Sequence, residues 1–161
     1  MVSGRKLSEL IVRLGQHSGV SNLGLTKLWK LIFFIEARAL RDLGEPVTGS
    51  EFIKYEHGSE PSRGDKFLKK LVKAGEVTST QRSVGGKTLN ESKAVRAADL
   101  STFSFEERQL VDSLCVELGR RSALDLSYFS HEEPSWHYAA MRDKLPPELI
   151  AYGHKEDPEG L

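Results

Sequence analysis

The sequence has very little of the residue that most often marks a redox or zinc site. Cys115 is the one cysteine among 161 residues, which excludes an internal disulfide and a zinc site built from several thiolates. It falls on an apolar helical stripe, where a free cysteine usually acts as a small core residue. We therefore expect no cysteine nucleophile.

Two further signatures of chemistry are missing. Gly85 and Gly86 lack the Lys-Ser/Thr residues of a phosphate-binding loop. His131 and Glu132 begin a string similar to a zinc motif, but the next histidine is His137. Six positions turn a helix by about 240°, so the two imidazoles face different sides. The sequence predicts a protein that is not an enzyme, with no catalytic residue, metal or cofactor.

Long apolar runs are also missing. The longest, Leu31–Ile35, is far shorter than the roughly 18 residues that suggest a membrane span. Glu9 and Arg13 interrupt what would have to be the apolar core of a signal peptide. Apolar residues make up 39% and charged residues 29% of the chain, a balance typical of globular proteins. We expect a cytoplasmic protein that does not contact the membrane.

The chain has no net charge, yet its charges are unevenly distributed. Residues 63–96 carry nine Lys/Arg and three Asp/Glu, whereas residues 97–161 carry six and thirteen. A basic middle and an acidic end suit nucleic-acid binding at one patch, or pairing of these segments within one molecule or with a partner.

Apolar periodicity predicts helices over residues 4–17 and 26–43. The second is apolar over so much of its girth that we expect it at the centre of the fold. Its polar stripe includes Lys30 and Arg38, with Phe34 between them, and these three residues are candidates for partner binding. The alternative, that a neighbouring element covers Phe34, stays open because large aromatics are mostly buried.

The middle of the chain has the order of elements found in a winged helix. A short strand over residues 51–56 and a turn-rich loop over 57–64 precede a helix over 65–74. A β-hairpin with a Gly85-Gly86 turn follows. Candidate phosphate contacts in this region are Lys69, Lys70, Lys73, Arg82 and Lys87. The alternative is a solvated hairpin whose charges face water or the acidic end of the chain.

The C-terminal third is predicted to be helical, with a capping box at Ser104 and Glu107. A second box at Ser130–Glu133, followed by Pro134, indicates a corner where one helix ends and the next begins. We expect Trp136 to anchor this corner by burial, and His131 to hold it by hydrogen bonds. Phe129, His131 and Trp136 are further candidates for partner binding.

Together these patterns predict one predominantly helical α+β domain with a small β-hairpin, over residues 1–145. Pro146 and Pro147 open a last short helical turn, and residues 146–161 are predicted to be this turn followed by a flexible tail.

Several stretches, taken in order, resemble the SocA-like Panacea domain. They are Leu25–Phe34, Gly44–Lys54, Leu68–Gly75, Phe105–Glu107, Leu126–His131 and Trp136. Phe33 stands where the family frequently has tyrosine, and Glu56–Ser62 departs from the family's Tyr-Gly-Pro-Val-Pro stretch. The resemblance implies a non-enzymatic antitoxin, of the kind also found with phages, that neutralises a cognate bacterial protein toxin by forming a complex with it.

Two hypotheses of different classes follow. The first is the antitoxin of a type II toxin-antitoxin system, which binds a protein toxin encoded next to it. The second is a DNA-binding transcriptional regulator that uses the basic hairpin. The sequence leaves self-association into a homo-oligomer open.

Overall fold

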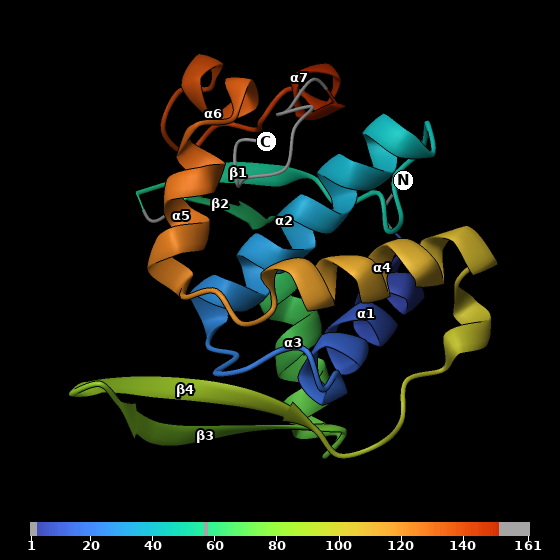
Figure 1. The fold of residues 1–161 in the computed structure, drawn as a ribbon, viewed down its shortest axis with the longest axis vertical. Helices are drawn as coiled ribbons and strands as arrows, with labels where there is room; N and C mark the ends of the chain where they lie inside the picture. Colours follow the sequence, from blue (N-terminus) through green and yellow to red (C-terminus); the bar gives the residue numbers. More distant parts are fainter. Residues whose placement is uncertain (1–2, 57, 152–161) are drawn as a thin grey trace.

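The computed structural model describes residues 3–56 and 58–151 (Figure 1). Within these ranges the chain forms a predominantly helical α+β domain, as predicted. The helices are α1 (Gly4–Gln16), α2 (Leu25–Asp42), α3 (Gly64–Lys73), α4 (Phe105–Leu118), α5 (Ala123–His131), α6 (Pro134–Tyr138) and α7 (Pro147–Ala151), with a 3₁₀ turn at Leu100–Thr102. The strands form two antiparallel pairs, β1 (Phe52–Tyr55) with β2 (Gly58–Pro61) and β3 (Val77–Val84) with β4 (Lys87–Ala94). No described helix combines the length and apolar character needed to cross a bilayer.

Helix α2 runs through the middle of the domain, with α4 and α5 packed across it (Figure 1). Strand β2 and helix α7 also contact it. Leu28, Ile32 and Phe33 are fully buried, and the Phe33 ring meets the Phe52 ring edge to face, with centroids 5.3 Å apart. Because elements cover α2 on several sides, its burial extends beyond the apolar face that the periodicity marked.

The loop predicted over residues 57–64 was wrong, since Gly58–Pro61 is strand β2. Its composition lacks the β-branched residues that favour strands, so pairing with β1 decides its conformation. Gly58 has a φ of 116°, which glycine adopts without strain. His57 lies outside the described residues.

The predicted β-hairpin is confirmed. Gly85 and Gly86 have φ values of 57° and 79°, as a two-residue turn of the type that suits twisted hairpins requires. Val84 pairs with Lys87 beside the turn, and Val77 pairs with Ala94 at the other end. The hairpin lies at the bottom of Figure 1, on the opposite side of the molecule from α6 and α7.

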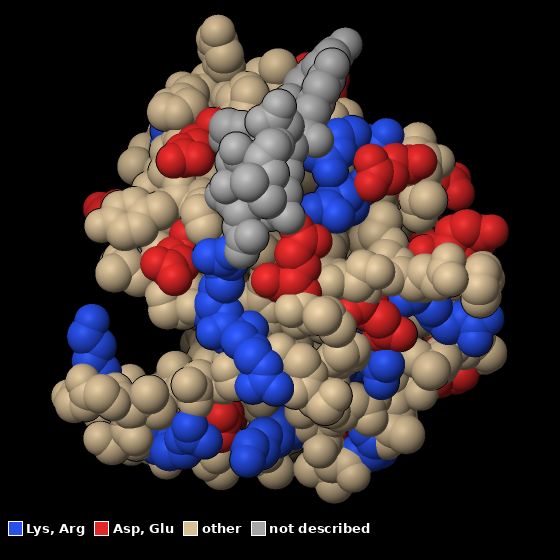
Figure 2. Space-filling model, viewed as in Figure 1, with Lys and Arg blue, Asp and Glu red and all other residues tan. Residues whose placement is uncertain are grey.

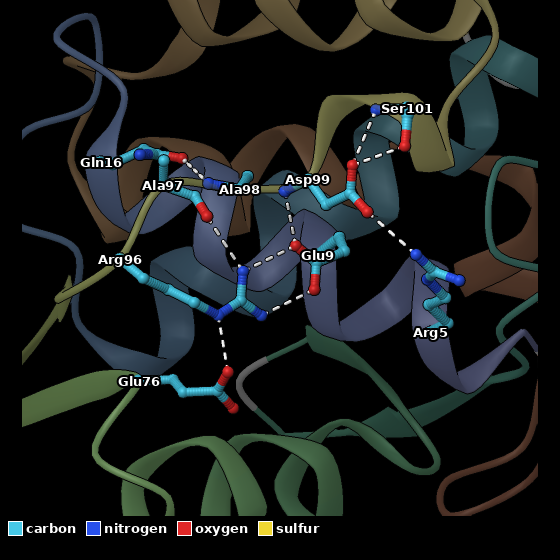
Figure 3. Close-up of polar contacts among 9 residues, drawn as sticks. All are labelled: Arg5, Glu9, Gln16, Glu76, Arg96, Ala97, Ala98, Asp99 and Ser101. Atoms are coloured by element: carbon cyan, nitrogen blue, oxygen red, sulfur yellow. Dashed lines mark hydrogen bonds and ion pairs between the residues drawn. The ribbon is translucent and has the colours of Figure 1, made fainter.

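An ion-pair network fixes the base of the hairpin to α1 (Figure 3). The guanidinium of Arg96 donates to both carboxylate oxygens of Glu9, at 2.8 and 2.7 Å, and to Glu76 at 2.6 Å. The backbone N–H of Asp99 also donates to Glu9, at 2.7 Å. The hydrogen bonds from Arg96 hold the pKa of Glu9 below its usual value against the effect of burial. Arg96 therefore joins elements within the fold.

The C-terminal part begins as predicted. The Ser104–Glu107 capping box is present, with the Ser104 N–H donating to Glu107 at 2.8 Å and the Glu107 N–H to Ser104 at 3.1 Å. The last described element, α7, packs against α2 and buries Ile150. The flexible tail predicted after this turn lies outside the described residues, from position 152 onward.

Candidate partner-binding surfaces

Lys30, predicted on an exposed stripe, is fully buried in α2. Its ammonium donates a 2.9 Å hydrogen bond to the backbone carbonyl of Ser59 in β2. Gly58 allows this approach, because a Cβ atom there would lie 2.2 Å from Cε of Lys30. Burial lowers the pKa of Lys30 from 10.5 to about 8. The prediction that Lys30 meets a partner at the surface was therefore wrong, because β2 covers it.

The other two residues of the predicted stripe are also covered to different degrees. Phe34 is 8% exposed, so the alternative that a neighbouring element covers it is confirmed. Arg38 is half-buried and lies 3.4 Å from the Glu117 carboxylate of α4. Packing of α4, α5 and β2 on α2 turns the expected partner surface into an interior contact.

The corner between α5 and α6 exists, but its capping differs from the prediction. Ser130 lies inside α5, and its hydroxyl donates to the Ser127 carbonyl at 2.9 Å. Glu133 is the residue that precedes α6, and it makes no side-chain cap. Pro134 occupies the first turn of α6, as predicted. The predicted cap was wrong because α5 continues through Ser130 to His131, so that Glu133 takes the position before α6.

Aromatic stacking holds this corner. The His131 ring stacks on Trp136, with centroids 4.2 Å apart and planes 18° from parallel. Lys54 of β1 places its ammonium 4.4 Å from the centre of the Trp136 ring and donates to the Trp136 carbonyl at 2.8 Å. The expected hydrogen bonds of His131 are not seen at Nε2, which has no partner among the described residues. Trp136 itself is half-buried, so it anchors the corner by stacking more than by burial.

Charge and burial both act on the imidazole of His131. Burial lowers its pKa below 6.5, and the nearby Lys30, Lys54 and His137 lower it further.

Arg121 lies over the ring of Phe129, 5.3 Å from its centre. Across the described ranges, no group of three or more His, Cys, Asp or Glu residues is placed to hold a metal ion.

The predicted nucleic-acid residues lie on two separate elements. Lys69 pairs with Asp65 at 2.9 Å, and Lys70 lies over the Phe67 ring of the same helix. Lys73 is exposed at the end of α3. Because α3 contacts β3 near the base of the hairpin, the turn end is about 20 Å away along an eight-residue strand.

At the hairpin itself, Arg82 contacts Glu91 at 3.3 Å and the side chain of Asn22. Lys87 is exposed beside the turn. Carboxylates of the same domain therefore partly neutralise the predicted set, and the structure does not gather it into one compact patch. Its binding to DNA stays a prediction.

Sequence reasoning missed a groove between the hairpin and the body of the molecule. Two adjoining hollows of about 220 and 300 Å³ lie there, and Figure 2 shows the notch at the lower left, beside the hairpin. The cations that line them are Lys27, Lys87, Arg120 and Arg121. These residues come from three distant segments, so only their spatial meeting marks the groove, and no local motif could have done so.

Comparison with protein families gives one match. A family model described as "Antitoxin SocA-like, Panacea domain" matches residues 28–137. This range begins inside α2 and ends inside α6, so it spans both strand pairs, α3, α4 and α5. Comparison with curated proteins found no match, and comparison with solved structures found none.

Proposed function

Since the chain belongs to the family of SocA-like antitoxins with a Panacea domain, we propose that it is the antitoxin of a type II toxin-antitoxin system. In this proposal it neutralises a cognate protein toxin, encoded next to it, by binding the toxin directly. The observation that carries the proposal is the family match, which covers more than half of the chain and includes most of the central helix α2.

In this proposal the chain acts without catalysis. Cys115 is fully buried, and burial raises the pKa of its thiol from 9.0 to about 12. A thiol with so high a pKa is almost entirely protonated at neutral pH and is a poor nucleophile. The ring of His131 is occupied by its stack on Trp136. The buried thiol is therefore unsuited to chemistry and the His131 ring holds the corner, which supports the proposal that the chain acts by binding another molecule.

Growth rescue tests the proposal. The protein encoded by the adjacent open reading frame is expressed from an inducible promoter, with and without this chain. We expect growth to stop when the neighbour is expressed alone and to resume when the chain is present at equal or higher level. A chain with a Leu31→Asp substitution, which places a charge in the core, serves as the unfolded control. A neighbour that is harmless, or toxicity that the intact chain leaves unchanged, would remove the proposal.

The DNA-binding alternative makes a different prediction. Binding of the purified chain to its own promoter would weaken steeply as salt rises, because each phosphate contact releases counterions. Absence of binding at about 50 mM salt would dismiss this alternative.

A further inference from the structure

The groove between the hairpin and the body has one wall made by the outer side of β4. Thr88, Leu89 and Asn90 line it on this side, and the start of α2 and the loop between α4 and α5 line it opposite. Gly24 lets β4 approach α2 closely, since a Cβ atom there would lie 2.3 Å from a methyl group of Leu89. The groove is therefore built by close packing at its inner end and opens toward the hairpin turn.

The backbone of β4 is available along this wall. At the inner end the N–H of Ser92 donates to the Leu23 carbonyl at 2.8 Å, so this residue points its backbone away from β3. In an antiparallel pair the backbone groups of every second residue point to the same side. Asn90 and Thr88 therefore turn their N–H and C=O groups outward as well. Because the described sheet has only the two strands β3 and β4, this edge can accept a further strand.

The charge of the groove is positive throughout. Its lining includes four cations, and none of the described residues that line it is acidic. Lys27, which is 3% exposed, donates to the Ser21 carbonyl, and Arg120 donates to the Ser18 carbonyl at 3.4 Å. Both cations are thus held in place by neutral carbonyls, and among the described residues no carboxylate forms an ion pair with either of them.

The electrostatic environment of Lys27 agrees with this geometry. Burial, followed by repulsion from Arg120, lowers its pKa from 10.5 to about 8. A carboxylate that entered the groove would oppose both effects and raise this pKa again.

We propose that this groove binds an extended, acidic segment of the toxin, which adds as a strand to the outer edge of β4. The inference rests on the proposed function, because it takes the partner to be the toxin. Backbone hydrogen bonds at Thr88 and Asn90 hold the segment in register, while its carboxylates meet Lys87 and Arg120. Leu124 and Tyr128, which are 62% and 61% exposed, are one turn apart on α5, and Leu124 directly follows Ala123 of the groove lining.

A peptide fits the groove better than a nucleic acid does. A strand edge recognises another peptide backbone through paired N–H and C=O groups, whereas phosphates need only cations. Outside the groove, Lys69 and Arg82 are paired with Asp65 and Glu91, which weakens their attraction for phosphates.

The test measures affinity for a catalytically inactive form of the neighbouring protein by isothermal titration calorimetry. The charge variant combines Lys87→Glu and Arg120→Glu, both at exposed positions. Its matched control combines Lys69→Glu and Lys73→Glu on α3, with the same change of charge. We expect Kd to rise at least about 30-fold for the groove variant and less than about 3-fold for the control.

A backbone variant tests strand addition separately. Thr88→Pro removes an outward N–H that β3 does not use, so the hairpin is expected to remain folded. We expect Kd to rise at least about 10-fold, and circular dichroism of the free chain to stay unchanged. Ser79→Pro is its control, because Ser79 pairs with Ser92 and by the same alternation turns its N–H away from β4, on the strand that does not line the groove.

The outcomes separate the two proposals. If the intact chain binds the neighbour and both groove variants bind equally well, the groove inference is overturned and the proposed function stands. If the intact chain does not bind the neighbour, both proposals are overturned. If the charge variant instead loses binding to a 20-base-pair duplex while keeping its affinity for the protein, the groove is a nucleic-acid site and the inference is wrong.

Discussion

Lys30 places a charged side chain in the interior of the domain, where it is 1% exposed. Its pKa of about 8, compared with 10.5 in water, means that burial disfavours the charged form by about 3 kcal/mol. The hydrogen bond to the Ser59 carbonyl offsets only part of this amount. Lys30 therefore joins α2 to β2 at the expense of stability.

Replacing Lys30 by methionine keeps the length of the side chain and removes its charge. We expect the free energy of unfolding at pH 7 to stay equal or to rise by up to about 2 kcal/mol, because the desolvation penalty exceeds the lost hydrogen bond. The folded lysine releases its proton near pH 8 and the unfolded one near 10.5, so the advantage of the variant shrinks as pH rises through this range. Urea unfolding at pH 7, 9 and 10.5 measures this difference in the free energy of unfolding between the two proteins. A variant that is less stable at pH 7 by more than about 2 kcal/mol would show that Lys30 stabilises the fold.

The environment of His131 predicts that the folded domain loses stability in mild acid. Its pKa is lowered in the folded chain, mainly by burial, whereas the unfolded chain takes up the proton near pH 6.5. The unfolded state therefore binds more protons below that pH, and the free energy of unfolding falls as pH drops from 7.5 to 5.5. His131→Phe, which keeps an aromatic ring against Trp136, is expected to reduce this fall. An identical pH dependence in both proteins, measured by urea unfolding, would contradict the assignment of this fall to His131.

At the scale of the elements, the sequence predicts those helices and strands whose conformation depends on local patterns of residues. Helices α1, α2 and α4 follow from apolar periodicity and caps, and the hairpin follows from two adjacent glycines between strand-like segments. Strand β2 was missed because its residues favour a turn, and only pairing with β1 makes it a strand. The capping box at Ser130 was misplaced because its pattern does not reveal that α5 continues past it.

The attachment of the hairpin to α1 depends on Arg96. Arg96→Met removes the partner of Glu9, a carboxylate that is 7% exposed. We expect the free energy of unfolding at pH 7 to fall by about 2 kcal/mol. The ion pair of Glu9 stabilises the fold fully above the pKa of an unfolded carboxyl group, and this stabilisation is lost as pH falls through the lowered pKa of folded Glu9. The stabilities of the wild-type chain and of Arg96→Met therefore converge in acid.

Arg5→Met, which removes an ion pair with Asp99 that is exposed on both sides, is the control for Arg96→Met. We expect it to change stability by less than about 1 kcal/mol. Equal effects of the two substitutions in urea unfolding would show that the network at Glu9 has no special role.

At the scale of the whole molecule, the uneven charge has a structural meaning that the sequence left open. The ion pairs that reach the acidic helix α4 come from α1 and α2, through Lys6, Arg13 and Arg38. The basic segment 63–96 instead places Lys87 on a groove without carboxylates. This distribution favours an acidic partner over pairing of the two segments within one chain.

The candidate site could be predicted only in part, because the sequence does not show which surfaces other elements cover. Composition and the resemblance indicated a protein that binds another macromolecule, but the α2 stripe chosen for it is interior. A pattern along one helix marks which residues are polar, and it does not reveal whether β2 and α5 cover them. The groove depends on Lys27, Lys87 and Arg120, which are far apart in the sequence.

Direct titration of the purified chain with the purified, inactivated protein of the adjacent open reading frame tests the central claim. Analytical ultracentrifugation and calorimetry are expected to show a stoichiometric complex with a Kd below about 1 μM, at a salt concentration near 150 mM. Restored growth in cells without any such complex between the purified proteins would contradict neutralisation by direct binding.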